Sequence, residues 1–370
     1  MKFFFTTPSL SLSGVNTASA GIVRALRLLG ADARLLITDP AGRDPSPLPL
    51  SGDIPVARLG ATRFTGKAAR RRMLRGFLED EAPCVYVPGY DFALSDVSRR
   101  LSDKVAVLGV LHSDEAVHYR HVERLGRFWN RIVAVSGFLA REAARRFPEC
   151  AGRVVFIPSG VTAPLAPPPR PDRDGPLRIA YAGRLSSYQK RVLDLAPAAL
   201  LLDLWGHPFS LVIAGEGKSR RALARRMSGL SRQGLVRFTG TLSNEAVCEL
   251  FRQSHAFVLT SDFEGTPVAL LEAMAAGCVP VVTDIRSGIP ELVEDGVTGL
   301  LTPVGEPVAL AGRLALLSKN RDLWESLSRN AHAKIARGPY LIENVAKRYI
   351  EEAENSFREV RSGRFRRPKA

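Results

Sequence analysis

Features that mark several other protein classes are missing from this chain of 370 residues. Its four cysteines lie far apart and form no Cys-x-x-Cys pair; they are Cys84, Cys150, Cys248 and Cys278. This spacing predicts neither a structural zinc site nor a disulfide framework. A reducing cytoplasm is the simplest setting for such thiols, so we expect a cytoplasmic protein.

Long apolar runs are also missing. Glu272 interrupts the longest one, Val268–Val282, and no run approaches the roughly 20 apolar residues of a membrane-spanning helix. The apolar start, Phe3–Phe5, ends at Thr6, far short of the apolar region of a signal peptide. We therefore expect neither a signal peptide nor a transmembrane helix.

Acidic residues are scarce only in parts of the chain, whose net charge is +15. Residues 1–165 carry 23 Lys and Arg against 15 Asp and Glu, and residues 357–370 carry 6 against 1. Aromatic residues make up 7% of the chain and are not interleaved with the basic ones, as a nucleic-acid site would require. We expect no nucleic-acid partner. This distribution favours peripheral attraction to an anionic surface, such as the inner face of the membrane.

The most basic segment is 63–78, in which five arginines and a lysine alternate with apolar residues. Its apolar members are Phe64, Met73, Leu74, Phe77 and Leu78. Two interpretations remain open. The segment is either a basic amphipathic helix that lies on anionic lipid, or an ordinary helix with a solvated charged face.

Short apolar runs alternate with helical patterns in both halves of the chain, which predicts the α/β class with parallel sheets. In the first half the expected strands are Lys2–Phe5, Arg34–Ile37, Val85–Val87, Val105–Val110, Ile132–Val135 and Val154–Ile157. In the second half they are Leu177–Tyr181, Ser210–Ala214, Val236–Phe238, Ala256–Leu259 and Val279–Val282. Residues 40–60, rich in Pro and Gly, are expected to form a long surface loop.

A proline-rich run, 163–176, separates the two halves and is typical of an interdomain linker. We therefore expect an N-terminal domain over 1–162 and a second domain over 177–340. A last helix at 341–358 and a disordered basic tail at 359–370 complete the predicted organisation.

The segment most indicative of a ligand site is Thr260–Gly277. Thr266 as N-cap and Pro267 as first helical residue predict a helix that starts directly after a strand. Such a helix start is an anion site at the carboxyl edge of a sheet. Glu264 and Glu272 flank it and could accept hydrogen bonds from the sugars of a nucleotide sugar. The alternative for Glu272 is a paired surface glutamate, although an idle charge among its apolar neighbours would be costly.

A second segment places two cations after the strand Leu177–Tyr181. The strand ends at Gly183, Arg184 follows, and Lys190 lies near the next predicted helix. Two cations at a strand-to-helix junction suit a pyrophosphate and could neutralise the charge that develops on it as a leaving group. The alternative is an ordinary pair of solvated side chains.

Three more residues stand at predicted strand ends. Gly215 closes a strand and Gly14 follows the first strand; each either admits a ligand to the backbone or makes a tight turn. His112 ends the strand that begins at Val105, at the edge where ligands bind in open α/β folds. His118 and His121 follow on a helical stretch and are expected to be ordinary residues.

We predict no metal site. Asp172-Arg-Asp174 has the Asp-x-Asp pattern that holds a divalent metal in some sugar transferases, but it lies in the proline-rich linker. No cluster of histidines and no other carboxylate pair has the spacing of metal ligands.

Taken together, these segments resemble the glycosyltransferases of the two-Rossmann-domain architecture (GT-B), and within it family 4, the retaining "glycosyl transferases group 1". The matching segments are AGRLSSYQKR, VIAGEG, FEGTPVALLEAMAAGCVPVVTD and SGIPELVEDGVTGLLTP. The resemblance implies two Rossmann-like domains that face each other across a cleft. The N-terminal one would bind the acceptor and the C-terminal one the nucleotide-sugar donor.

The resemblance also implies roles for individual residues. Arg184 and Lys190 would hold the donor diphosphate, Glu264 would lie at the transferred sugar, and Glu272 would bind the ribose hydroxyls. His112 would contact the sugar from the other domain. The remaining donor-site residues would be Gly14, Gly183, Gly215, Gly265, Thr266 and Pro267. Ser13 departs from the pattern, because many relatives have glycine there.

The predicted activity is therefore the transfer of a hexose from a UDP- or GDP-sugar, without a metal or another cofactor. The expected acceptor is a glycan or a lipid-linked acceptor in surface polysaccharide or glycolipid synthesis. The resemblance implies retention at the anomeric carbon. We can place no second carboxylate as a nucleophile, so same-face attack assisted by the leaving phosphate is the expected route. The alternative is a sugar-nucleotide epimerase of the same architecture.

Overall fold

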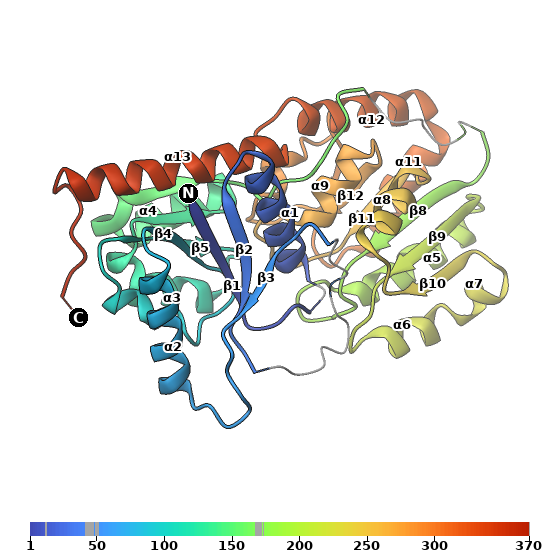
Figure 1. Cartoon of the computed structure of the whole chain (residues 1–370). Helices are drawn as coiled ribbons and strands as arrows, with labels where there is room; N and C mark the ends of the chain where they lie inside the picture. The colour runs from blue at the N-terminus through green and yellow to red at the C-terminus, as the bar shows by residue number, and fades with distance from the viewer. Residues whose placement is uncertain (12, 41–47, 49–51, 167–171, 173, 370) are drawn as a thin grey trace. The chain divides into compact units, whose positions relative to one another are not determined.

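The computed structural model describes residues 1–11, 13–40, 48, 52–166, 172 and 174–369. The chain divides into two compact units. Unit 1 is Met1–Gly160 together with Ile342–Ala370, and unit 2 is Val161–Leu341. Each unit is built on one parallel sheet with helices packed against it (Figure 1). The predicted α/β class with two Rossmann-like domains is confirmed.

Unit 1 contains a sheet of seven parallel strands in the order β3-β2-β1-β4-β5-β6-β7. The strands are β1 (Lys2–Thr7), β2 (Asp32–Ile37), β3 (Val56–Arg58), β4 (Cys84–Pro88), β5 (Val105–Leu111), β6 (Arg131–Ala134) and β7 (Val154–Phe156). Its helices are α1 (Gly14–Leu28), α2 (Lys67–Asp80), α3 (Ala116–Leu125), α4 (Gly137–Arg146) and α13 (Ile342–Arg361), with short 3-10 turns at Ser95–Arg100, Gly126–Phe128 and Pro148–Arg153.

Helices packed against both faces explain why the central strands of unit 1 are apolar at nearly every position. Phe3, Phe4 and Phe5 on β1 are all buried, as is every residue of β5. A strand that alternated polar and apolar residues would place polar side chains in this core. The two-sided packing therefore accounts for the continuous apolar runs in the sequence.

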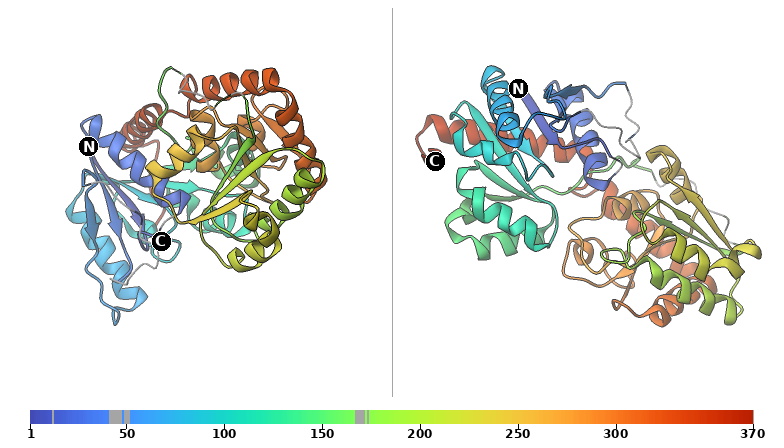
Figure 2. Two further views of the ribbon diagram at one scale, coloured as in Figure 1. Left: turned by 90° about the vertical axis from the view of Figure 1, so that its right-hand side faces the viewer. Right: turned by 90° about the horizontal axis from the view of Figure 1, so that it is seen from below.

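The last helix, α13, belongs to unit 1 although the chain reaches it from unit 2. It packs beside α1, as Figure 1 and Figure 2 show, and its Tyr349 ring lies 5.5 Å from the ring of Phe5. Arg131 on β6 joins it through a buried ion pair to Glu352, at 2.7 Å, and a partly buried one to Glu359, at 2.8 Å. The end of the chain therefore completes the core of the unit in which the chain begins.

The predicted disorder of the basic tail is wrong. Residues up to Arg361 are helical, Phe365 is buried, and Arg367 donates hydrogen bonds to backbone carbonyls of Phe128, Leu101, Ser102 and Val105. The tail is held because these carbonyls lie together at the amino edge of the sheet, where they form a socket for one guanidinium group. That socket is assembled from two segments of the chain, before β5 and before β6, so local composition could not reveal it.

Unit 2 contains six parallel strands in the order β10-β9-β8-β11-β12-β13. The strands are β8 (Leu177–Ala182), β9 (Phe209–Ala214), β10 (Val236–Gly240), β11 (Ala256–Leu259), β12 (Val279–Thr283) and β13 (Leu300–Thr302). The helices are α5 (Leu195–Leu204), α6 (Arg220–Arg226), α7 (Ser228–Arg232), α8 (Asn244–Arg252), α9 (Val268–Ala275), α10 (Ile289–Leu292), α11 (Pro307–Lys319) and α12 (Arg321–Ala336), with a 3-10 turn at Val192–Asp194.

The sequence analysis did not predict two short strands, β3 in unit 1 and β13 in unit 2. Each has three residues and lies at the edge of its sheet, so its apolar pattern is too short to stand out. β3 lies within the segment 40–60, which was expected to be loop throughout; of that segment, residues 41–47 and 49–51 lie outside the described ranges. Among the described residues, no helix combines the length and apolar character that a membrane crossing requires.

Candidate active site

The sheet of unit 2 has a topological switch point between β8 and β11. β9 and β10 continue from β8 in one direction, whereas β11, β12 and β13 extend the sheet in the other. Loops that leave the carboxyl ends of β8 and β11 therefore diverge and open a crevice between them, which is where ligands bind in such folds. These two loops contain Arg184, Lys190 and Glu264.

The structure joins two of the predicted site residues directly. Lys190 Nζ lies 2.5 Å from Glu264 Oε1, and both side chains are largely buried. Ser261 Oγ donates to the same carboxylate oxygen at 2.7 Å, and Gln189 Nε2 lies 3.4 Å from the other oxygen. The carboxylate of Glu264 is thus held by three partners, of which the sequence analysis identified only Lys190.

Backbone contacts hold the two loops in register. The Asp262 amide donates to the Gln189 carbonyl at 2.9 Å, and Thr260 Oγ1 donates to the Lys190 carbonyl at 2.7 Å. Arg191 follows with φ of 44°, an uncommon conformation for a residue other than glycine. This left-handed residue turns the chain directly after Lys190, while its guanidinium donates to Asp194 at 2.8 Å. The neighbouring ion pairs therefore compensate a strained turn.

Arg184 contrasts with Lys190. Its side chain is exposed and makes no hydrogen bond or ion pair with any residue that the structure describes. Only its backbone is anchored, because the Tyr181 hydroxyl donates to the Arg184 carbonyl at 3.0 Å. With Lys190 already paired to Glu264, Arg184 supplies an uncompensated positive charge to these loops.

The glycines at these strand ends have a reason in the fold itself. A Cβ on Gly215 would lie 2.0 Å from the Gly183 carbonyl oxygen, so the loops after β8 and β9 approach too closely for any side chain there. Gly215 also has φ of 130°, which disfavours other residues. Loop packing thus explains Gly215 without a ligand, while its contact with a donor stays a prediction.

Helix α9 begins one residue later than the sequence predicts. Pro267, with ψ of 119°, is the N-cap and Val268 the first helical residue, so the assignment of Thr266 as N-cap is wrong. Because proline lacks an N–H and fixes φ, it suits this boundary as well as the next position. The Gly265 carbonyl accepts from the Gly288 amide at 2.8 Å, which orients the turn before the helix. The start of α9 therefore lies directly after Glu264 at the same edge of the sheet.

Glu272 lies on α9, half-buried among apolar side chains. Asn244 Nδ2, from the start of α8, donates to its Oε1 at 2.6 Å. Burial raises the pKa of Glu272 to about 7, although the Asn244 hydrogen bond lowers it. Further hydrogen-bond donors would stabilise the ionised form of this buried carboxylate. The two hydroxyl groups of a ribose diol could supply them. The sequence analysis did not identify Asn244, because nothing in the local sequence distinguishes an asparagine that contacts Glu272 from any other polar residue at the start of a helix.

In unit 1 the loop after β1 is organised by a buried asparagine that the sequence analysis did not single out. Asn16 donates to the carbonyls of Ser9 and Ser11 and accepts from Thr7 Oγ1 at 2.9 Å. Ser13 is extended, with φ of −153°, and its hydroxyl caps α1, whose first residue is the exposed Gly14. No positive φ is needed at Ser13, which explains why serine can replace glycine there. Leu12 lies outside the described residues.

His112 directly follows β5 at the carboxyl edge of the unit 1 sheet. Its Nε2 atom is buried and has no hydrogen-bond partner among the described residues. Burial, with smaller contributions from His118 and His121, lowers the pKa of His112 to about 3. The imidazole is therefore neutral at pH 7 and can exchange a hydrogen bond with a hydroxyl group, but it does not offer a positive charge.

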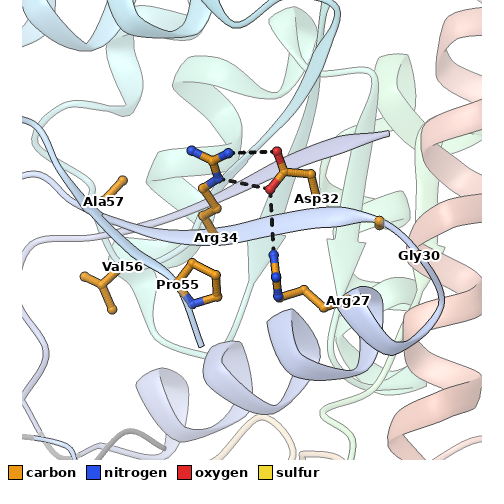
Figure 3. Close-up of a pocket in the computed structure, with 8 residues that line it drawn as sticks. Arg27, Gly30, Asp32, Arg34, Pro55, Val56 and Ala57 are labelled. Atoms are coloured by element: carbon orange, nitrogen blue, oxygen red, sulfur yellow. Dashed lines mark hydrogen bonds and ion pairs between the residues drawn. The ribbon is translucent and has the colours of Figure 1, made fainter. Parts of the chain in front are cut away.

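A surface pocket in unit 1 lies away from these residues, at the opposite edge of the sheet. Figure 3 shows Arg27 and Arg34 directed at Asp32, the first residue of β2, with Val56 beside them. Arg34 forms two hydrogen bonds with Asp32, at 2.9 and 3.0 Å. Both arginines thus already pair with the same carboxylate, and none of the predicted site residues lines this pocket. In the described ranges, no group of three His, Cys, Asp or Glu side chains is arranged to hold a metal ion.

Residues 167–334 match the family model for glycosyl transferases group 1. The colanic acid biosynthesis glycosyltransferase WcaL of Salmonella typhimurium is 36% identical over 170 residues, which cover 44% of this chain and 41% of that protein. The amylovoran biosynthesis glycosyltransferase AmsK of Erwinia amylovora is 37% identical over 151 residues, 39% of this chain and 36% of its own. These alignments span about two fifths of the relatives' own length.

Solved structures agree over nearly the whole chain. A mutant of TarM from S. aureus, in complex with fondaparinux, alpha-GlcNAc-glycerol and UDP, has a TM-score of 0.79 at 12% identity and covers 96% of this chain and 99% of its own. HepE of Anabaena in complex with UDP-glucose has a TM-score of 0.73 at 18% identity, with coverages of 96% and 100%. The fold is thus that of the GT-B glycosyltransferases, and residues 167–334 are similar to their group 1 family.

Proposed function

We propose that the whole chain is a glycosyltransferase that moves a hexose from a nucleotide diphosphate sugar to a glycan acceptor. The observation that carries this proposal is the arrangement at the switch point of unit 2. There an unpaired Arg184, the Lys190–Glu264 pair and the start of α9 come from two adjacent strand ends. Cations and a helix start suit a diphosphate, and carboxylates suit the sugars on either side of it.

The donor roles follow from charge and position. Arg184 is free to bind the diphosphate, and Lys190 can share its charge between Glu264 and the departing phosphate as the glycosidic bond breaks. Glu264 would then face the transferred sugar, and Glu272 would accept hydrogen bonds from the ribose. UDP is the first nucleotide to test, because neighbours of the same fold were solved with UDP or UDP-glucose.

Retention and metal independence remain parts of the proposal. Same-face attack assisted by the leaving phosphate needs no second carboxylate as a nucleophile. Positive side chains and a helix start would neutralise the leaving group in place of a metal. Nothing in the comparisons supports the alternative of a sugar-nucleotide epimerase.

The acceptor is proposed to belong to surface polysaccharide or glycolipid synthesis, since the aligned WcaL and AmsK proteins are named for colanic acid and amylovoran biosynthesis. A lipid-linked acceptor would place the protein at the inner face of the membrane. The exposed basic residues Arg72 and Arg75 on α2 and Arg63 before it are the side chains available for that contact.

The test is incubation of the full chain with UDP-glucose, UDP-galactose, UDP-N-acetylglucosamine and GDP-mannose, with and without a mixture of glycan acceptors. We expect nucleoside diphosphate release from one donor, with the anomeric configuration kept in the product, and undiminished activity in excess EDTA. An epimerised donor without transfer would refute the proposal. Activity lost in EDTA and restored by Mn²⁺ or Mg²⁺ would refute metal independence alone.

A further inference from the structure

Aromatic and imidazole rings meet around Tyr90 at the carboxyl edge of the unit 1 sheet, and one of them is Phe92, whose ring lies 5.4 Å from that of Tyr90. Tyr90 follows β4, His112 follows β5, and His118 lies on α3. The Tyr90 ring lies 5.4 Å from the His112 ring and 5.2 Å, edge-on, from the His118 ring. The Tyr90 hydroxyl is also 3.2 Å from His118 Nε2. Tyr90 is 37% exposed although both neighbours hold it, so it presents a fixed aromatic surface to solvent.

Both histidines beside Tyr90 have a buried polar atom without a partner in the part of the chain that the structure describes, and so has Ser113, which follows His112. His118 Nδ1 and Ser113 Oγ, on side chains that are 1% and 4% exposed, have no hydrogen-bond partner among the described residues, and neither has His112 Nε2. A buried polar group left unsatisfied costs about 1–3 kcal/mol. Three such atoms on neighbouring residues indicate a place where a ligand supplies the missing partners.

The next histidine of the same helix shows the contrast. His121 is as buried as His118, but its Nε2 lies 2.6 Å from Ser95 Oγ, and its ring packs edge-on against Phe92 and Trp129. His121 packs in the core and fits the expectation that it is an ordinary residue. His118 differs because one nitrogen faces Tyr90 while the other has no partner.

The chemistry of the cluster favours an uncharged ligand. Burial lowers the pKa of His118 to about 4, so its imidazole is neutral at pH 7. Neither Tyr90 nor Ser113 carries a charge there, so the cluster lacks the cations that a phosphate or carboxylate would require. An exposed aromatic face beside a few hydroxyl and imidazole groups instead matches a sugar ring, which has apolar C–H faces and a rim of hydroxyl groups.

We propose that Tyr90, Ser113 and His118 form a sugar-binding site in unit 1, which takes an uncharged pyranose of the acceptor. The sugar ring stacks on Tyr90, and its hydroxyl groups satisfy Ser113 Oγ and His118 Nδ1. The assignment of this site to the acceptor rests on the proposed transferase function, whereas sugar binding itself does not.

The test is ligand-detected NMR on the full chain, without a donor, using the methyl α- and β-pyranosides of glucose, galactose, mannose and N-acetylglucosamine. We expect at least one glycoside to bind with a millimolar dissociation constant. Tyr90→Ala should weaken binding at least tenfold, whereas Tyr90→Phe, which keeps the ring, should weaken it by less. His118→Gln should also weaken it. Trp205→Ala in unit 2 is the control, because Trp205 is a 43% exposed aromatic residue outside the cluster and outside the donor loops.

Nucleoside diphosphate binding is measured on the same variants to show that the donor site is intact. Unchanged glycoside binding in Tyr90→Ala would overturn the proposal, as would failure of the wild type to bind any glycoside of the panel. If His118→Gln fails to fold, Tyr90→Ala and Tyr90→Phe still test the proposal. Tyr90 is partly exposed, so we expect both variants to fold. If glycoside binding depends on Tyr90 but the chain transfers no sugar, the sugar-binding site is supported and the transferase function is refuted.

Discussion

At the scale of single residues, Glu272 links donor binding to pH. Burial raises its pKa to about 7 in the free protein. Only the ionised carboxylate accepts hydrogen bonds from both ribose hydroxyls, so binding favours loss of the proton. Because the carboxylate is protonated as the pH falls below 7, the affinity for the nucleoside diphosphate should fall by up to about tenfold for each further pH unit. Isothermal titration calorimetry between pH 5.5 and 8.5 measures this.

The phosphate groups of the nucleoside diphosphate also titrate in this pH range. Two variants separate the contribution of Glu272 to the pH dependence of binding from theirs. Glu272→Gln should bind weakly with a flatter pH profile. Asn244→Ala should move the inflection to higher pH, because the Asn244 hydrogen bond lowers the pKa of Glu272. An inflection that stays in place in Glu272→Gln would show that another group controls donor binding.

Arg184 and Lys190 should behave differently when replaced, although the sequence presents them as equivalent cations. Arg184 is exposed and unpaired, so Arg184→Ala should lower turnover by about 10²–10³-fold without changing stability. Lys190→Met should lower turnover and also destabilise unit 2 by about 3 kcal/mol, since it leaves the buried carboxylate of Glu264 without its cation. Chemical denaturation and turnover are measured on both variants.

The ion pair itself is tested by a second substitution. In the Lys190→Met background, Glu264→Gln removes the uncompensated charge and should recover part of the lost stability without recovering activity. If Lys190→Met unfolds at the same denaturant concentration as the wild type, the pair contributes nothing to stability.

At the scale of elements, the tail after α13 should stabilise unit 1. Arg367 donates to four backbone carbonyls, and burial lowers its pKa to about 10. Arg367→Ala leaves those acceptors without a donor, which should cost about 1–3 kcal/mol. The unfolding temperature should then fall by roughly 2–4 °C for each kcal/mol.

Arg366→Ala is the matched control for the tail, because the adjacent Arg366 is exposed. Its unfolding temperature should equal that of the wild type. Equal effects of the two substitutions would mean that the tail acts through charge alone and not through the carbonyl socket.

At the scale of the whole molecule, membrane association should be electrostatic. The apolar residues of α2 are committed to the fold: Leu74 and Leu78 are buried, and Phe77 packs edge-on against Phe4 at 5.0 Å. Arg70 and Arg71 pair with Asp39 and Asp96. The basic residues of α2 that remain exposed are Lys67, Arg72 and Arg75, and in the loop before the helix Arg63 and Phe64 are exposed, Phe64 to 83%. The helix therefore cannot insert an apolar face into lipid without leaving the core.

Sedimentation with liposomes tests this association. The chain should bind vesicles that contain phosphatidylserine at low salt, release them at high salt, and ignore neutral vesicles, since each basic residue near an anionic surface contributes about 1 kcal/mol. Arg72→Ala combined with Arg75→Ala should weaken binding, while Arg24→Ala, an exposed arginine on α1 paired with Asp53, should not. Equal binding of neutral and anionic vesicles would contradict an electrostatic contact.

The sequence alone determined the features that depend on local pattern. Strand and helix periodicity predicted two α/β domains, and the spacing of Glu264 and Glu272 around a helix start predicted a donor site. Such patterns are legible because each residue's environment repeats along one element. Only the tertiary structure decided which groups pair. β8 and β11 lie side by side although β9 and β10 separate them in the chain, and this sheet order brings Lys190 to Glu264. The carbonyl socket for Arg367 arises likewise from distant loops, because hydrogen bonding depends on proximity in space and not along the sequence.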